Sequence, residues 1–118
     1  MKPSRILVCG GRDFSDVKFV NLSLDHLAHW FADEFCVIQG GAKGADFHAG
    51  RWADSLGICN ITVRANWDFY GNAAGTIRNN WMADFCMPQL CVHFPGGIGT
   101  KRMVDYCKFL GIPTYGPI

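Results

Sequence analysis

Three glycine-rich segments carry side chains that suit phosphate binding: residues 10–13, 40–46 and 95–100. Glycine lets an anion approach main-chain N–H groups closely and tolerates positive φ. Within these segments, the guanidinium of Arg12 and the ammonium of Lys43 can neutralise phosphate oxygens. Because glycine also serves in tight strand-to-helix turns, a purely structural role is the alternative for any one segment. The candidate anion-binding residues are Gly10, Gly11, Arg12, Asp13, Gly40, Gly41, Lys43, Gly44, Asp46, Pro95, Gly96, Gly97, Gly99 and Thr100.

A second group of candidates lies between these segments. Arg78, followed by Asn79, falls in the first turns of a predicted helix, where a cation is unfavourable unless an anion accompanies it. We therefore expect Arg78 to clamp phosphate and Asn79 to contact the ligand. Trp67 and Tyr70 lie in a polar loop and either stack on a base or pack that loop onto the domain.

Acids and histidines add weaker candidates for chemistry. Asp13 and Asp46 stand at predicted helix starts, where an aspartate contacts a ribose hydroxyl or caps the helix; capping is the expected role of Asp46. His48 and His93 are expected to be structural rather than catalytic. Cys86, Cys91 and His93 match no standard zinc spacing, so we expect no metal site.

Alternating apolar patterns predict the elements that position these residues. Buried strands are expected at 5–9, 35–39, 59–63, 89–94 and 112–115. Helices are expected between them, and residues 64–75 form a long loop. The predicted fold is α/β, a Rossmann-like three-layer fold with a parallel sheet of about five strands, whose strand-to-helix loops all lie at one edge.

The predicted helix faces are equally specific. Ser15 or Asp16 caps the first helix. Apolar stripes expected to be buried are Val17, Val20, Leu24, Leu27 and Phe31 in the first helix, Ala45, Ala49, Trp52, Ala53 and Leu56 in the second, and Met103, Val104, Cys107 and Leu110 in the last; the third runs from Ile77 to Phe85.

Composition limits the classes of function. The 118 residues are 49% hydrophobic and 18% charged with a formal net charge of +1, which fits one globular domain over residues 1–118. This charge argues against nucleic-acid and membrane partners. The amino terminus shows no signal-peptide pattern, so we expect a cytoplasmic protein whose six cysteines stay reduced.

Two common nucleotide motifs are missing. No segment fits G-x-x-x-x-G-K-[ST], and Gly10-Gly11 lacks the later glycine of G-x-G-x-x-G, so neither a P-loop nor a standard dinucleotide cofactor site is expected. We accordingly expect no cofactor.

Two other segments resemble the SLOG superfamily, named for the Smf/DprA and LOG proteins. Arg78 and Met82 match the R-K-x-x-M segment of LOG-type phosphoribohydrolases, and residues 95–100 match the start of P-G-G-x-G-T-x-x-E. In those enzymes the arginine and the final glutamate serve N-glycosidic cleavage of a nucleoside 5′-monophosphate. Here the glutamate position is Met103.

The whole chain is more similar still to the small YspA-like SLOG proteins of bacteria and phages. That resemblance rests on Gly10–Phe14, Gly40–Asp46, Trp67–Gly71, Ala74-Gly75 and Arg78-Asn79. It implies a Rossmann-like fold that binds a nucleotide-derived small molecule.

The expected function is therefore binding or sensing of a nucleotide-derived ligand. The alternative is a LOG-like N-glycosidase in which Arg78 is catalytic and Asp13, Asp46 or Asp105 replaces the missing glutamate. Asp105 lies about 200° around a helix from Met103, so it cannot take over on the same face. DNA binding, by analogy with the Smf/DprA branch, is disfavoured by the net charge. A homodimer or higher homo-oligomer is also expected, with Trp30, Trp52 or Trp81 at the interface.

Overall fold

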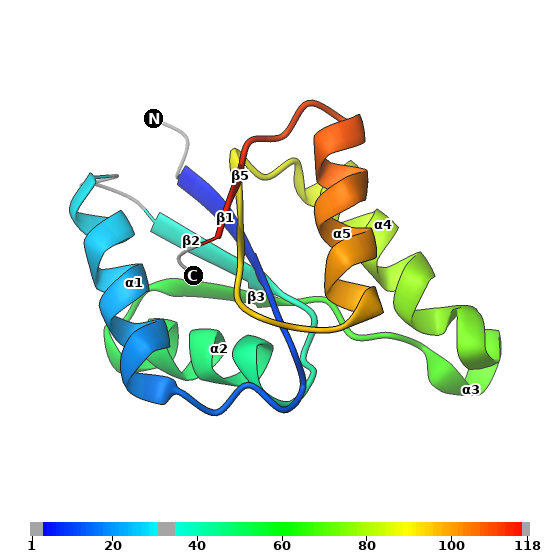
Figure 1. The fold of residues 1–118 in the computed structure, drawn as a ribbon, viewed down its shortest axis with the longest axis horizontal. Coiled ribbons are helices and arrows are strands. Elements are labelled where there is room, and N and C mark those ends of the chain that lie inside the picture. Colours follow the sequence, from blue (N-terminus) through cyan, green and yellow to red (C-terminus); the bar gives the residue numbers. More distant parts are fainter. Residues whose placement is uncertain (1–3, 31–34, 117–118) are drawn as a thin grey trace.

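A five-stranded parallel sheet forms the centre of the protein (Figure 1). The structure is a computed structural model that describes residues 4–30 and 35–116. The strand order is β3-β2-β1-β4-β5, and every neighbouring pair is parallel. The strands are β1 (Ser4–Cys9), β2 (Phe35–Gln39), β3 (Cys59–Thr62), β4 (Leu90–His93) and β5 (Thr114–Tyr115). The predicted α/β fold and strand number are confirmed.

Helices cover both faces of this sheet (Figure 1). On one face lie α1 (Val17–Trp30) and α2 (Ala45–Ser55), and on the other lie α4 (Ala74–Cys86) and α5 (Ile98–Phe109). Successive strand residues point to opposite faces, so β1 contributes Ile6 and Val8 to the α1–α2 core and Leu7 and Cys9 to the α4–α5 core. The central strands β1, β2 and β4 are mostly buried between the two helix layers, as their continuous apolar sequences predict. The edge strands β3 and β5 were also predicted to be buried, but they are largely exposed because each has only one neighbouring strand.

The segment 64–75 differs from the loop that the sequence suggested. It contains α3 (Trp67–Tyr70) and a 3-10 turn (Gly71–Ala73), and α4 starts at Ala74 rather than at Ile77. Asn66 begins α3 by accepting a hydrogen bond from the Phe69 N–H at 3.1 Å. This short capped helix was missed because four residues carry no periodic apolar signal.

Most predicted helix faces are buried, but three end residues are not. Val20, Leu24 and Leu27 of α1 are buried, and Asp16 caps this helix by accepting from the Phe19 N–H at 3.0 Å. Val17, Leu56 and Leu110, by contrast, are exposed because they lie at or beyond the helix ends. The predicted Phe31 contact falls outside the described residues.

The three tryptophans proposed for an interface separate into two groups. Trp30 and Trp81 are exposed, whereas Trp52 is only 4% exposed and its Nε1–H donates to Asp25 Oδ1 at 2.8 Å. Trp52 is therefore a core residue, as the apolar stripe of the second helix predicted, and the suggestion that it lies at an interface is wrong. The oligomeric state remains a prediction.

All six cysteines are free thiols. None of the helices in the described part of the chain is both long and apolar enough to cross a membrane.

Candidate functional site

A cavity of about 310 Å³ opens at the carboxyl ends of the strands, between the glycine-rich loops and helices α4 and α5. This is the edge at which ligands bind in open parallel sheets. Its lining consists of Cys9, Gly10, Gly11, Arg12, Ala42, Asp46, Trp67, Asn72, Gly75, Thr76, Arg78, Asn79, Asn80, Met82, Gly97, Gly99, Thr100, Arg102 and Met103. All three predicted glycine segments contribute to it.

Backbone hydrogen bonds hold the three loops together. The Gly11 N–H donates to the Pro95 carbonyl at 2.9 Å, and the Ala45 N–H donates to the Gly11 carbonyl at 3.2 Å. Gly44 has φ +78°, and a Cβ at this residue would lie 2.2 Å from the Gly11 carbonyl oxygen. Glycine at 44 is thus required by both backbone conformation and space, which places the first loop between the other two.

The amino terminus of α5 presents an open backbone to the cavity. Gly97 precedes the helix and makes no side-chain capping bond, and a Cβ at Gly97 or Gly99 would meet no atom within 4 Å. The first N–H groups of a helix have no partner inside the helix and carry partial positive charge. A phosphate oxygen fits the chemistry of this turn.

Arg78 lines the cavity and is hydrogen-bonded to the second loop. Its Nη1–H donates to the Gly40 carbonyl, and its Nε–H donates to Asn79 Oδ1 at 2.8 Å. A Cβ at Gly40 would lie 2.3 Å from Nη1 of Arg78, so any larger residue there would displace the guanidinium. Arg78 and Arg12 line the same cavity, and their contact with phosphate remains a prediction.

Asp46 is the carboxylate beside Arg78. Its Oδ2 accepts a hydrogen bond from the Gly40 N–H at 3.0 Å, so Asp46 fixes the second loop. The prediction that Asp46 caps its own helix is wrong, because Gly44 is the N-cap residue and no side chain caps α2. Burial raises the pKa of Asp46, and the attraction of Arg78 opposes that rise. Burial likewise lowers the pKa of Arg78, and Asp46 opposes that fall.

Trp67 and Arg12 form the outer rim. The Arg12 guanidinium carbon lies 5.6 Å from the centre of the Trp67 ring, and both side chains are exposed. A flat aromatic ring beside a cation suits a ligand that joins a base to a phosphate. Tyr70 packs edge-on against Phe69 and does not belong to the lining.

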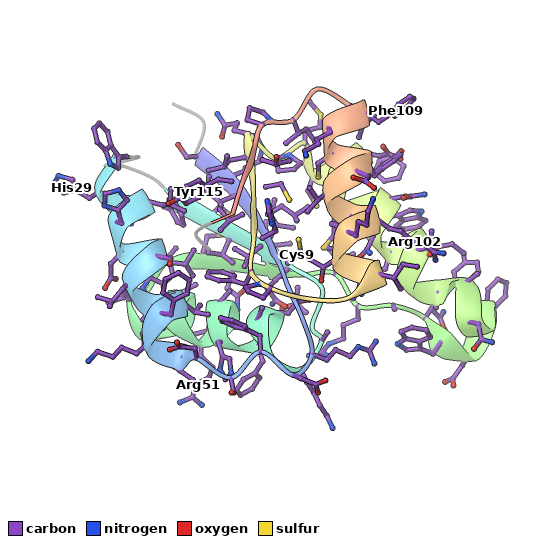
Figure 2. The ribbon with its side chains drawn as sticks, viewed as in Figure 1. Cys9, His29, Arg51, Arg102, Phe109 and Tyr115 are labelled. Atoms are coloured by element: carbon purple, nitrogen blue, oxygen red, sulfur yellow. The ribbon has the colours of Figure 1, made fainter. Side chains whose placement is uncertain are left out.

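Arg102 is a cavity residue that the sequence analysis missed. It is the fifth residue of α5, and Figure 2 shows it near the amino-terminal end of that helix, on the side of α4. Arg102, like Arg78, is a cation near a helix start, where it is unfavourable unless an anion accompanies it. This signal in the sequence could have identified Arg102. Asn72, Thr76 and Asn80 were missed as well, and Asn80 directly follows the motif pair Arg78-Asn79.

Several predicted residues lie outside this lining. In the described part of the chain, the residues that line the cavity do not include Asp13, Gly40, Gly41, Lys43, Gly44, Pro95 and Gly96. Gly44 and Gly96 instead allow close contacts with the first loop, since a Cβ at Gly96 would lie 2.7 Å from the Gly11 backbone nitrogen, and Gly40 leaves room for the Arg78 guanidinium. Direct ligand contact by these residues remains a prediction.

The remaining chemical candidates are also outside the cavity. Asp105 is exposed and forms an ion pair with Lys101 at 2.7 Å. His93 is half-buried, and burial together with Lys108 lowers its pKa. No group of three His, Cys, Asp or Glu residues in the described part of the chain is arranged to hold a metal.

Met103 occupies the position of the LOG glutamate and does line the cavity. Its side chain is only 1% exposed and packs with Cys9, Met82 and Val104. This position faces the site with a thioether, which supplies no charge and no proton.

Comparisons with known proteins agree with this architecture. The model of the YspA, cpYpsA-related SLOG family (YAcAr) matches residues 4–70. The Gene 61 protein of Mycobacterium phage D29 is 32% identical over an alignment that covers 93% of each chain. The X-ray structure of DNA processing protein A (DprA) from Streptococcus pneumoniae superposes with a TM-score of 0.78 at 18% identity, over 97% of this chain and 50% of that one. That likeness shows a shared fold, and the chain spans half the length of DprA. The family model and the phage relative show that this chain belongs to the YspA-related SLOG family.

Proposed function

We propose that this protein binds a nucleotide-derived small molecule in the cavity at the carboxyl ends of the strands, and does so without cleaving it. The observation that carries the proposal is the charge of the lining. The described lining residues include three arginines, Arg12, Arg78 and Arg102, and one acid, Asp46, so three positive charges minus one negative leave +2. An anionic ligand offsets that charge.

The lining also separates two kinds of recognition. The open first turn of α5 with Arg102 suits phosphate oxygens, and the exposed ring of Trp67 suits the face of a base. The cavity volume of about 310 Å³ is in the range of small-molecule sites. Family membership supports the same class of ligand.

Cleavage is not proposed because the lining lacks a free carboxylate. N-glycosidic cleavage passes through an oxocarbenium-like state that a nearby carboxylate stabilises. Met103 cannot do this, and the Asp46 carboxylate already accepts from the Gly40 N–H and faces Arg78. Among described residues Asp46 is nevertheless the one acid that lines the cavity, so an enzyme would have to use it.

A thermal-shift screen across nucleoside mono- and diphosphates, dinucleotides and ADP-ribose derivatives tests binding. A ligand at about 100 times its Kd should stabilise the protein by about 2.7 kcal/mol, or about 10 °C in Tm. Arg78→Ala should abolish the shift, as should Gly97→Asp, which adds a negative charge at the open helix start. Gly97→Ala is the matched control. If no anionic ligand raises Tm, or if both variants retain the full shift, the proposed site is wrong.

A further inference from the structure

Outside the cavity, two cysteines on neighbouring strands are in direct contact. Cys36 of β2 and Cys59 of β3 are register partners, and the Cys36 Sγ–H donates to Cys59 Sγ at 2.9 Å. Paired strands run about 4.8 Å apart, which is within the range of about 4.4–6.8 Å that a disulfide spans between Cα atoms. We propose that Cys36 and Cys59 form a redox-active pair, which peroxide converts to an intramolecular disulfide and a dithiol returns to two thiols.

Exposure distinguishes this pair from the other thiols. Cys59 is exposed on the edge strand β3, whereas Cys36 is only 2% exposed. Cys9 and Cys91 also approach each other, with sulfur atoms 4.0 Å apart, but both are buried. An oxidant in solution therefore reaches Cys59 and not the Cys9–Cys91 contact.

The reaction balances in two steps. The Cys59 sulfur attacks one peroxide oxygen, which breaks the O–O bond and gives a sulfenic acid and one water. The Cys36 sulfur then attacks the Cys59 sulfur, and the hydroxyl group leaves with the thiol proton as a second water. Peroxide is reduced by two electrons, and the two sulfurs are oxidised by two.

The surroundings of Cys36 make the second step depend on pH. Burial, followed by the contact with Cys59, raises the pKa of Cys36 to about 12. The resolving thiol is therefore mostly protonated near neutrality, so the second step accelerates as pH rises. Cys86, the last residue of α4, is half-buried and also raises the pKa of Cys36 through its charge. It is therefore the cysteine that could compete with Cys59 for a disulfide with Cys36.

This pair is separate from the proposed ligand site. Cys36 and Cys59 lie at the amino ends of β2 and β3, while the cavity is at the carboxyl ends. The inference consequently does not depend on ligand binding, and it can fail without affecting that proposal.

The test treats the reduced full-length protein with hydrogen peroxide, then measures intact mass, titrates thiols after denaturation and maps the linked peptides. We expect loss of about 2 Da, a fall from six thiols to four, and a Cys36–Cys59 link that dithiothreitol removes. Cys59→Ser and Cys36→Ala should each prevent the link, and Cys86→Ser should leave it intact.

Three results would overturn the proposal. One is a link from Cys36 or Cys59 to Cys86. Another is an intermolecular Cys59–Cys59 link. The third is over-oxidation of Cys59 with Cys36 still a free thiol.

Discussion

At the residue scale, Asp46 joins two parts of the site. Its carboxylate holds the Gly40 N–H, and its charge compensates the partly buried guanidinium of Arg78. Arg78 in turn donates to the Gly40 carbonyl, so both polar groups of one peptide segment are fixed by this charged pair. The pair therefore positions the second loop in addition to setting the charge of the cavity.

The pH dependence of stability should reveal this carboxylate. Burial raises the pKa of Asp46 in the folded protein. At pH values between the ordinary pKa of aspartate and this raised pKa, Asp46 is therefore more protonated in the folded protein than in the unfolded chain. The Asp46 contribution to stability therefore falls as pH rises through that range and is constant above it. Urea unfolding of wild type and Asp46→Asn from about pH 3.5 to 7 measures the difference. A wild-type advantage that grows with pH would contradict this assignment.

Arg102 gives a second residue-scale prediction. A charge-assisted hydrogen bond from its guanidinium to phosphate contributes about 1.5–3 kcal/mol, so Arg102→Ala should weaken binding of an anionic hit by at least about tenfold. Arg51→Ala is the matched control, because Arg51 is exposed on α2 and Figure 2 shows it well away from Arg102. Calorimetric titration compares the two variants. Equal affinities would remove Arg102 from the site.

The sequence identified the cavity residues that carry a motif, but not those that the fold alone brings in. Arg12 was predicted because it lies in a glycine-rich segment, Trp67 because it lies in a polar loop, and Arg78 because it lies near a helix start. Asn72 and Thr76 were not, since Asn72 lies in a 3-10 turn that was not predicted and Thr76 lies in α4 before the predicted helix start at Ile77. The structural role of Asp46 was also hidden, because its acceptor contact depends on a loop conformation that no local pattern encodes.

At the scale of elements, glycines set how closely the loops and helices approach one another. A Cβ at Gly10 would lie 2.6 Å from the Ala45 Cβ and 3.0 Å from the Phe94 Cβ, both in the core. Gly10→Ala should therefore force β1 and α2 apart and destabilise the protein by about 1–3 kcal/mol. Gly97→Ala, with open space around it, should change stability by less than about 0.5 kcal/mol. Denaturant midpoints compare the pair, and equal midpoints would refute the packing argument.

The elements themselves followed from apolar periodicity wherever they are long and buried. β1, β2, α1 and α2 lie close to their predicted ranges, because each has a continuous apolar run or a clear 3.6-residue stripe. Strand β5 retains only Thr114–Tyr115 of the predicted 112–115, and Ile112 instead packs against the α4–α5 core. Element ends are decided by such tertiary contacts, which residue types do not reveal.

At the scale of the whole molecule, charge is concentrated in the site. The chain has a formal net charge of +1, yet the described cavity lining has +2 from three arginines and one aspartate. Attraction of a ligand is consequently local, and exposed charges at the rim are screened by salt. A positive charge confined to one cavity suits a small anion better than a nucleic acid, which needs positive charge along an extended surface.

The last prediction concerns what happens to that ligand. The purified protein should release free base from AMP and other nucleoside monophosphates no faster than buffer does, because Met103 supplies no carboxylate where the LOG motif has one. Chromatographic assay of free base measures this, with Asp46→Asn and Arg78→Ala as variants. Base release that both variants abolish would restore the enzyme hypothesis and assign the acid to Asp46. Met103→Glu would place a carboxylate at a site that is 1% exposed and packed against apolar neighbours, so we expect it to destabilise the fold by several kcal/mol rather than to create activity.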